Sequence, residues 1–119
     1  ATLGNRVRTA LGDDMSDSAQ RFATETLSAT SLDVVREYAV AMQALSNSKF
    51  EAARQSFSQA VKLDPNFGLA YAGMAIASAN MGQTQDAQTY VQEAIRHVDK
   101  MTERERFRTR GLFYYITND

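Results

Sequence analysis

Apolar side chains recur every three or four positions along most of this chain, which is the spacing of one face of an α-helix. Four consecutive stretches follow this spacing: Val34–Ser46, Phe50–Leu63, Gly68–Met81 and Thr84–Val98. A short polar turn separates the two members of each pair, and no segment keeps a long apolar–polar alternation typical of a strand. The pattern therefore predicts an all-α fold that contains two helical hairpins.

The two hairpins repeat each other at a constant offset of 34 residues. Small residues fall on small ones and apolar residues on apolar ones, without any gap. The matched pairs are Val40 and Met74, Ala41 and Ala75, Ala53 and Ala87, Phe57 and Val91, and Ala60 and Ala94. The turn residue Ser48 falls on Gly82, and glycine commonly ends helices. We therefore expect the hairpins to stack, because neither can bury its apolar face alone.

The period and these positions resemble the tetratricopeptide repeat family, whose repeats are about 34 residues long. In the first repeat the resemblance is carried by Val40, Ala41, Ser48, Phe50, Ala53, Phe57, Ala60 and Leu63–Pro65. In the second it is carried by Tyr71, Met74, Ala75, Gly82, Ala87, Val91 and Ala94. Glu37 and Asp99 depart from the family pattern. The resemblance implies a stack of antiparallel helical hairpins with a right-handed superhelical twist, and a module that binds proteins and is not an enzyme.

We divide the chain into four segments on this basis. They are residues 1–31, an N-terminal helical segment; 32–65, the first repeat; 66–101, the second repeat; and 102–119, the first helix of an incomplete third repeat. Thr102 and Glu105 have the spacing of a capping box at the start of that last helix. The chain begins with Ala and carries no signal peptide, so we expect it to be a piece of a longer protein.

The resemblance also implies a concave face, lined by the first helix of each repeat, that takes up a peptide or helix of a partner. Helical spacing from the core positions predicts its lining as Val35, Tyr38, Met42, Leu45, Leu69, Ala72, Ile76, Asn80, Arg108, Leu112 and Tyr115. Tyr38, Met42 and Ile76 stand where family members that grip the carboxyl terminus of heat-shock chaperones have polar residues. This largely apolar surface predicts an apolar partner. The alternative is that residues 3–27, or other parts of a longer protein, cover it.

Composition and motifs argue against several other chemistries. The chain has no cysteine, a single histidine and a formal net charge of −1. His97 falls on Leu63 at the 34-residue offset, which indicates a packing position, and we expect neither a metal nor a cofactor. No glycine-rich phosphate loop, nucleophile elbow or zinc-protease motif occurs, and no window approaches the ~20 apolar residues of a membrane span.

Three further hypotheses remain open. Phe107, Gly111 and Tyr114 would form an apolar face on the last helix, through which the chain would form a homodimer. The basic stretch 96–110 would bind nucleic acid, although acidic residues interrupt it and we do not expect this partner. Finally, Ser31–Asp33 and Thr102–Arg106 resemble segments in the C-terminal repeat regions of bacterial receptor-type serine/threonine kinases and transcriptional regulators. The sequence predicts no particular compartment.

Overall fold

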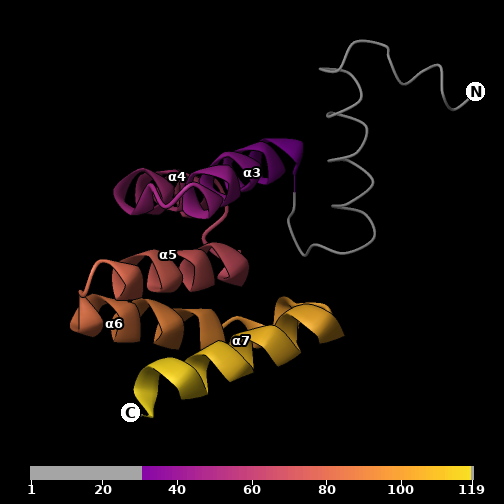
Figure 1. The fold of residues 1–119 in the computed structure, drawn as a ribbon. Helices are drawn as coiled ribbons and strands as arrows, with labels where there is room; N and C mark the ends of the chain where they lie inside the picture. The colour runs from indigo at the N-terminus through magenta and orange to yellow at the C-terminus, as the bar shows by residue number, and fades with distance from the viewer. Residues whose placement is uncertain (1–30, 119) are drawn as a thin grey trace, which may run out of the picture.

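The computed structural model describes residues 31–118, which form an all-helical fold without strands (Figure 1). Its elements are α3 (Leu32–Ser46), α4 (Phe50–Leu63), α5 (Gly68–Asn80), α6 (Thr84–Ile95), the 3-10 helix η1 (Val98–Lys100) and α7 (Glu103–Thr117). The expected all-α stack of helical hairpins is therefore confirmed. The helical faces expected between residues 3 and 27 lie outside the described residues.

Three helix ends differ from the positions that the apolar spacing predicts. The smallest difference is in α5, which ends at Asn80 and not at Met81. Helix α3 begins at Leu32, not Val34, because the backbone N–H of Val34 donates to Oγ of Ser31 at 3.3 Å and so caps the first turn. Helix α6 ends at Ile95, not Val98. From there the chain tightens, since the N–H of His97 donates to the carbonyl of Ala94, three residues back.

Both hairpins turn through a residue in the left-handed region, as the alignment of the two repeats predicts. Ser48 has a φ of 61° and Gly82 a φ of 78°. In each turn the N–H of the following residue donates to a carbonyl five positions earlier, at 2.8 Å in the first hairpin and 2.9 Å in the second. These bonds satisfy helix-end carbonyls in the manner of a Schellman motif.

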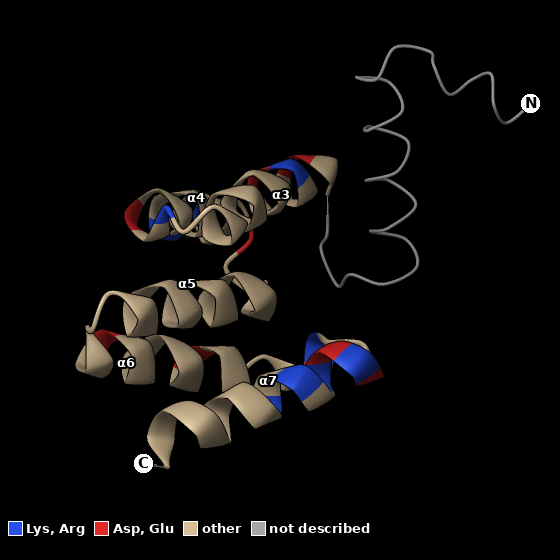
Figure 2. Ribbon diagram, in the orientation of Figure 1, with Lys and Arg blue, Asp and Glu red and all other residues tan. Residues whose placement is uncertain are grey.

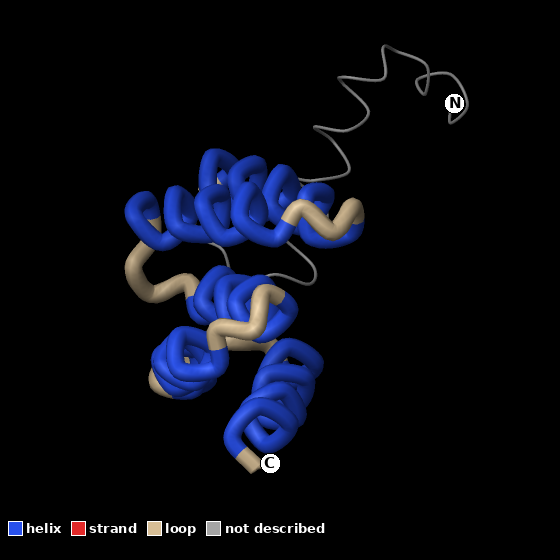
Figure 3. The backbone as a smooth tube through the Cα atoms, turned by 60° about the vertical axis from the view of Figure 1, so that its left-hand side comes forward, coloured by secondary structure: helices blue, strands red, loops and turns tan. Residues whose placement is uncertain are grey.

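Each helix packs on the next one along the chain, from α3 on α4 to α6 on α7, and α5 also touches α3 and α7 (Figure 3). The contacts between helices are made at alanines with no exposed surface, among them Ala41, Ala53 and Ala60. Phe57 is equally buried, and its ring lies where a Cβ atom on Gly73 would be. Small residues on one helix thus make room for a large side chain on its neighbour.

One matched pair of the repeats is not equivalent in burial. Val40 was aligned with Met74 as an apolar position, yet Val40 is 57% exposed while Met74 is 3% exposed. Helix α5 is covered by α4 on one side and α6 on the other, whereas α3 packs mainly on α4 and makes a small contact with α5. The same position in the repeat is therefore buried only where two neighbours flank the helix.

The linker between α6 and α7, residues 96–102, is folded and not a plain loop. It forms η1, and Met101 at its end is 6% exposed, close to the Cα of Gly68. Helix α7 then starts with the predicted capping box: the N–H of Glu105 donates to Oγ1 of Thr102 at 3.2 Å, and the N–H of Thr102 donates to Glu105 Oε1 at 3.1 Å. No helix within residues 31–118 combines the length and apolar character needed to cross a membrane.

Candidate functional site

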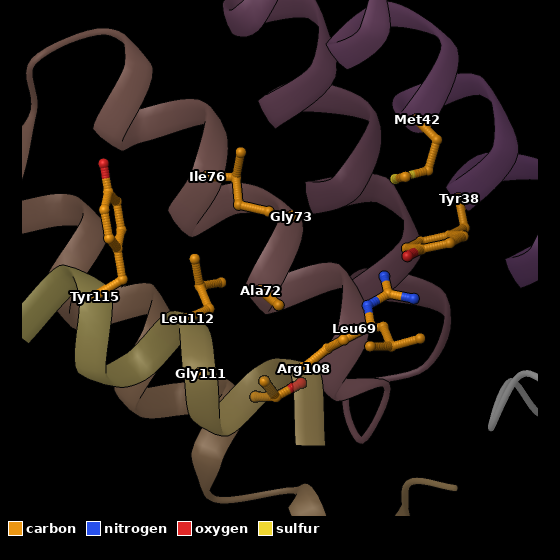
Figure 4. A pocket seen from close by; sticks show the side chains of 11 residues that line it. Tyr38, Met42, Leu69, Ala72, Gly73, Ile76, Arg108, Gly111, Leu112 and Tyr115 are labelled. Carbon is orange, nitrogen blue, oxygen red and sulfur yellow. The ribbon is translucent and has the colours of Figure 1, made fainter. Parts of the chain in front are cut away.

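A groove of about 390 Å³ lies between α3, α5 and α7, the first helices of the three successive units (Figure 4). This volume is near the lower end of the range of ligand sites, roughly 300 to 1,000 Å³. Eleven residues line it: Tyr38, Met42, Leu69, Ala72, Gly73, Ile76, Arg108, Thr109, Gly111, Leu112 and Tyr115. The packing of α3 and α7 against α5 brings these residues together from distant parts of the sequence.

Most of the residues predicted for the concave face line this groove. Those that do are Tyr38, Met42, Leu69, Ala72, Ile76, Arg108, Leu112 and Tyr115. Three others lie elsewhere. Val35 is 2% exposed in the core, Leu45 packs half-buried against it, and Asn80 is exposed and donates its side-chain amide to the carbonyl of Ile76 at 2.9 Å.

Three lining residues were not foreseen from the sequence. Gly73 and Gly111 contribute backbone, and Thr109 is 2% exposed with its hydroxyl 3.4 Å from Sδ of Met101. A signal was available for Gly73, which lies one helical turn after Leu69 on the same face of α5. None was available for Thr109, because its partner Met101 belongs to the linker that folds as η1.

Tyr38 joins the core to the groove. Its ring packs against Phe57 and Phe67, with centroid distances of 5.7 and 5.2 Å, and the residue is only 8% exposed. Burial raises the pKa of Tyr38 to about 12, while the positive charge of Arg108 acts in the opposite direction and the negative charge of Glu105 adds to the rise. Tyr38 is therefore primarily a core residue whose edge reaches the groove.

Arg108 is the one charged side chain in the groove lining. It is exposed, and Figure 4 shows it extending from α7 toward Tyr38. Within residues 31–118 it makes neither a salt bridge nor a hydrogen bond. Arg106, on the same helix, differs: its guanidinium donates to the carbonyls of Val98 and Met101 at 3.3 and 3.4 Å. Arg106 thus holds the linker in place, while the charge of Arg108 faces the groove.

The other basic residues do not form one surface. Figure 2 shows basic residues along the first half of α7, but side chains two positions apart on a helix point in different directions. Arg96, outside α7, lies 3.7 Å from the carboxylate of Glu93. The basic stretch is therefore divided among the groove, the linker and solvent.

His97 occupies a packing position. Its ring stacks on that of Tyr71 with centroids 5.8 Å apart and an interplanar angle of 12°, and Nε2 lies 3.7 Å from Oε2 of Glu93. In the part of the chain that the structure describes, no group of three or more His, Asp or Glu side chains has the geometry to hold a metal ion.

A second exposed apolar surface lies on α7, which we call the α7 outer face: Phe107, Gly111 and Tyr114. Phe107 is 80% exposed and Tyr114 is 64% exposed, and a Cβ on Gly111 would meet no atom within 4 Å. The corresponding surface of α5 includes Ala75 and Ser78, both without exposed surface, because α6 packs on α5. No described element covers α7 in this way.

A repeated pair of antiparallel helices, turned by a left-handed residue and stacked through alanines, defines an α-helical repeat protein. Residues 44–104 match a family described as tetratricopeptide repeat, and the match spans half of the chain. The chain belongs to the tetratricopeptide repeat family. Repeats of this family generally mediate protein–protein interactions. Comparisons with curated proteins and with solved structures found no significant match to this chain.

Proposed function

We propose that this chain is a scaffold module of a larger protein and that it binds an apolar peptide or helix of a partner in the groove. The observation that carries the proposal is the largely apolar lining contributed by three helices of the stack. Met42 is 38% exposed and Tyr115 is 79% exposed on opposite sides of this lining. Exposed apolar residues that gather in a groove typically mark a binding surface.

Peptide display on the folded chain tests this proposal. Selected peptides are synthesised, and their affinities are measured for the wild type and for Tyr115→Ser. We expect Tyr115→Ser to weaken binding about tenfold or more, because an aromatic side chain in a binding pocket contributes upward of about 1 kcal/mol.

Tyr114→Ser is the matched control. Tyr114 is the neighbouring residue, is also largely exposed and lies on the α7 outer face, outside the groove lining. Equal losses for the two variants, or no loss for either, would contradict the proposal. Tyr38→Ala is unsuitable as a test, because removing its buried ring would disturb the core.

Self-association is a second candidate function, which we base on the α7 outer face. Two copies would cover these faces by crossing at Gly111, where the absence of a side chain permits close approach. Light scattering over a concentration series measures the mass of the chain in solution. We expect a dimer that Phe107→Ser converts to a monomer and Tyr115→Ser leaves intact; a wild-type monomer at all concentrations would contradict it.

The parent protein that we propose is a bacterial receptor-type kinase or transcriptional regulator, which would make the module part of a signalling system. Its support is the resemblance of Ser31–Asp33 and Thr102–Arg106 to segments of such proteins. The coding sequence on both sides of this segment tests the proposal. A kinase or DNA-binding domain in the same reading frame is expected, and a full reading frame without either would contradict it.

A further inference from the structure

We propose that the segment bound in the groove carries one acidic side chain among apolar ones, and that its carboxylate binds the guanidinium of Arg108 and the hydroxyl of Tyr38. This inference rests on the proposed function, since it specifies the partner of the same groove. The occupant is a segment of another protein, in keeping with the interactions that the family generally mediates.

At its polar end the groove presents two hydrogen-bond donor groups, the Arg108 guanidinium and the Tyr38 hydroxyl, and neither has an acceptor within residues 31–118. Arg108 extends toward Tyr38 in Figure 4, and the two groups are close enough for the charge of Arg108 to influence the tyrosine hydroxyl. Neither group makes a hydrogen bond or a salt bridge with any other residue of 31–118. A carboxylate supplies two acceptor oxygens and a negative charge, so it satisfies both donors at once.

The remainder of the groove selects apolar side chains. The other lining side chains offer no charged group to a partner: Met42 on α3, Leu69 and Ile76 on α5, and Leu112 and Tyr115 on α7. A ligand that fits both parts therefore has an acidic group at the Arg108 end and apolar groups beyond it. Because the apolar walls exclude part of the solvent, the ion pair at Arg108 is screened less than a fully exposed pair.

The nearby carboxylate of Glu105 does not pair with Arg108, although its negative charge reaches the Tyr38 hydroxyl and its Oε2 has no hydrogen-bond partner among the described residues. Glu105 lies one helical turn before Arg108, but it is 3% exposed and its Oε1 accepts the N–H of Thr102 in the capping box. No salt bridge joins Glu105 to Arg108 in the described part of the chain. A partner contacts the guanidinium of Arg108 directly, whereas Glu105 is buried and acts on the Tyr38 hydroxyl only through its charge. Direct contact with Arg108 favours an acidic segment over a basic one.

An acidic side chain fits better than the carboxyl terminus of a partner. Arg108 is the one charged side chain among the residues that line the groove. One guanidinium and one hydroxyl are sufficient for a single side-chain carboxylate. The apolar residues of α5 and of the second half of α7 leave the rest of the groove to aliphatic or aromatic groups.

Peptide display with both peptide ends fixed in the display protein tests this inference, because every carboxylate in the variable region then belongs to a side chain. We expect the selected sequences to share one Asp or Glu near two or more apolar residues. A selected peptide with blocked ends should lose about tenfold in affinity when its acid is replaced by the amide, which corresponds to about 1.4 kcal/mol.

A double-mutant cycle then assigns the carboxylate to its partner. Arg108→Gln should weaken the acidic peptide about tenfold and should make the acid-to-amide replacement in the peptide nearly neutral. Arg110→Gln is the matched control, since Arg110 is exposed on the same helix and does not line the groove. It removes the same charge and should leave the affinity within about twofold. Thermal unfolding of each variant verifies that the fold is kept.

The possible outcomes separate this inference from the proposed function. If Tyr115→Ser weakens binding but Arg108→Gln does not, the groove binds proteins and the inference is wrong. If neither variant weakens binding, or if no peptide is selected, both are wrong. Binding of dodecanoate, a carboxylate with an apolar chain, in the absence of any selected peptide would also overturn the inference in favour of a lipid ligand.

Discussion

Helices α5 and α7 are the first helices of successive units, yet their surroundings differ greatly. Nine residues of α5 are buried: Gly68, Leu69, Ala70, Ala72, Gly73, Met74, Ala75, Ala77 and Ser78. Only Glu105 and Thr109 are buried on α7. The reason is the number of neighbours, because α5 lies between α4 and α6 whereas α7 packs mainly on α6 among the described elements. Equivalent positions in a repeat therefore acquire different roles from their place in the stack.

The amino-acid sequences of α5 and α7 differ in the same way as their burial. Helix α5 is composed almost entirely of small and apolar residues and contains no charged one, as a helix surrounded by others requires. Helix α7 has a charged first half and an aromatic second half. Of the three helices that bound the groove, α5 is thus fixed in the core, whereas α7 is held by its capping box and a single main neighbour. Helices with fewer buried contacts open more readily.

The largest contrast is expected between a phenylalanine that packs on α5 and one on α7. Phe57→Ala should lower the free energy of unfolding by about 3–5 kcal/mol, because it empties a fully buried site beside Gly73. At a protein concentration low enough for the chain to be monomeric, Phe107→Ala should change it by less than about 0.5 kcal/mol, because that side chain is 80% exposed in the single chain. Urea unfolding of both variants measures the contrast, and comparable losses would mean that the α7 outer face is covered in solution.

The stability of the fold should depend on alkaline pH through Tyr38, at one end of the groove, and not through Tyr115, at the other end. Burial raises the pKa of Tyr38 to about 12 from an ordinary value of 10.0, so the unfolded chain loses this proton first. Below pH 10 this hydroxyl is neutral in both the folded and the unfolded chain, and the fold keeps its full stability. Between pH 10 and 12 only the unfolded chain loses the proton, which lowers the free energy of unfolding by up to about 2–3 kcal/mol.

Tyr38→Phe should therefore reduce the fall in stability between pH 10 and pH 12. Tyr115→Phe is the control, since it removes a hydroxyl from a residue that is 79% exposed. Urea unfolding at several pH values up to 12 provides the measurement. An equally steep fall for wild type and Tyr38→Phe would show that the buried hydroxyl is not responsible.

The sequence predicts those features that depend on local spacing. The 34-residue offset of Ala41 and Ala75 locates the repeat, and the turn residues at Ser48 and Gly82 follow from the same alignment. The capping box at Thr102 follows from the identity of two residues three positions apart. Each of these features is determined within one helix or one turn, so neighbouring helices do not alter it.

Features that depend on neighbours could not be predicted in the same way. Val40 is exposed although its counterpart Met74 is buried, because burial depends on which helices flank the position. Val35 was expected in the groove but lies in the core, one position away from buried Val34. Helical spacing identifies a face about 100° wide, and the residue at its edge is assigned only once the crossing helix is placed.

Replacing either of the two glycines that line the groove by alanine should change the free energy of unfolding, but with opposite signs. Gly73→Ala would gain helix propensity, but its new Cβ would overlap the ring of Phe57, which has no free space to move into. We expect a net loss of about 1–2 kcal/mol in the free energy of unfolding, since overpacking a dense core costs more than propensity returns. Urea unfolding measures this loss. A Gly73→Ala variant more stable than wild type would show that α4 and α5 move apart easily.

Gly111→Ala on α7 is expected to have the smallest effect and the opposite sign. An added Cβ would meet no atom within 4 Å, and alanine favours a helix over glycine by up to about 1 kcal/mol. The variant should therefore be more stable than wild type by about 0.5–1 kcal/mol in urea unfolding at low protein concentration. A destabilised variant would mean that another surface lies directly on Gly111. If that loss grew with protein concentration, the surface would be a second copy of this chain, because only an intermolecular contact responds to concentration in this way.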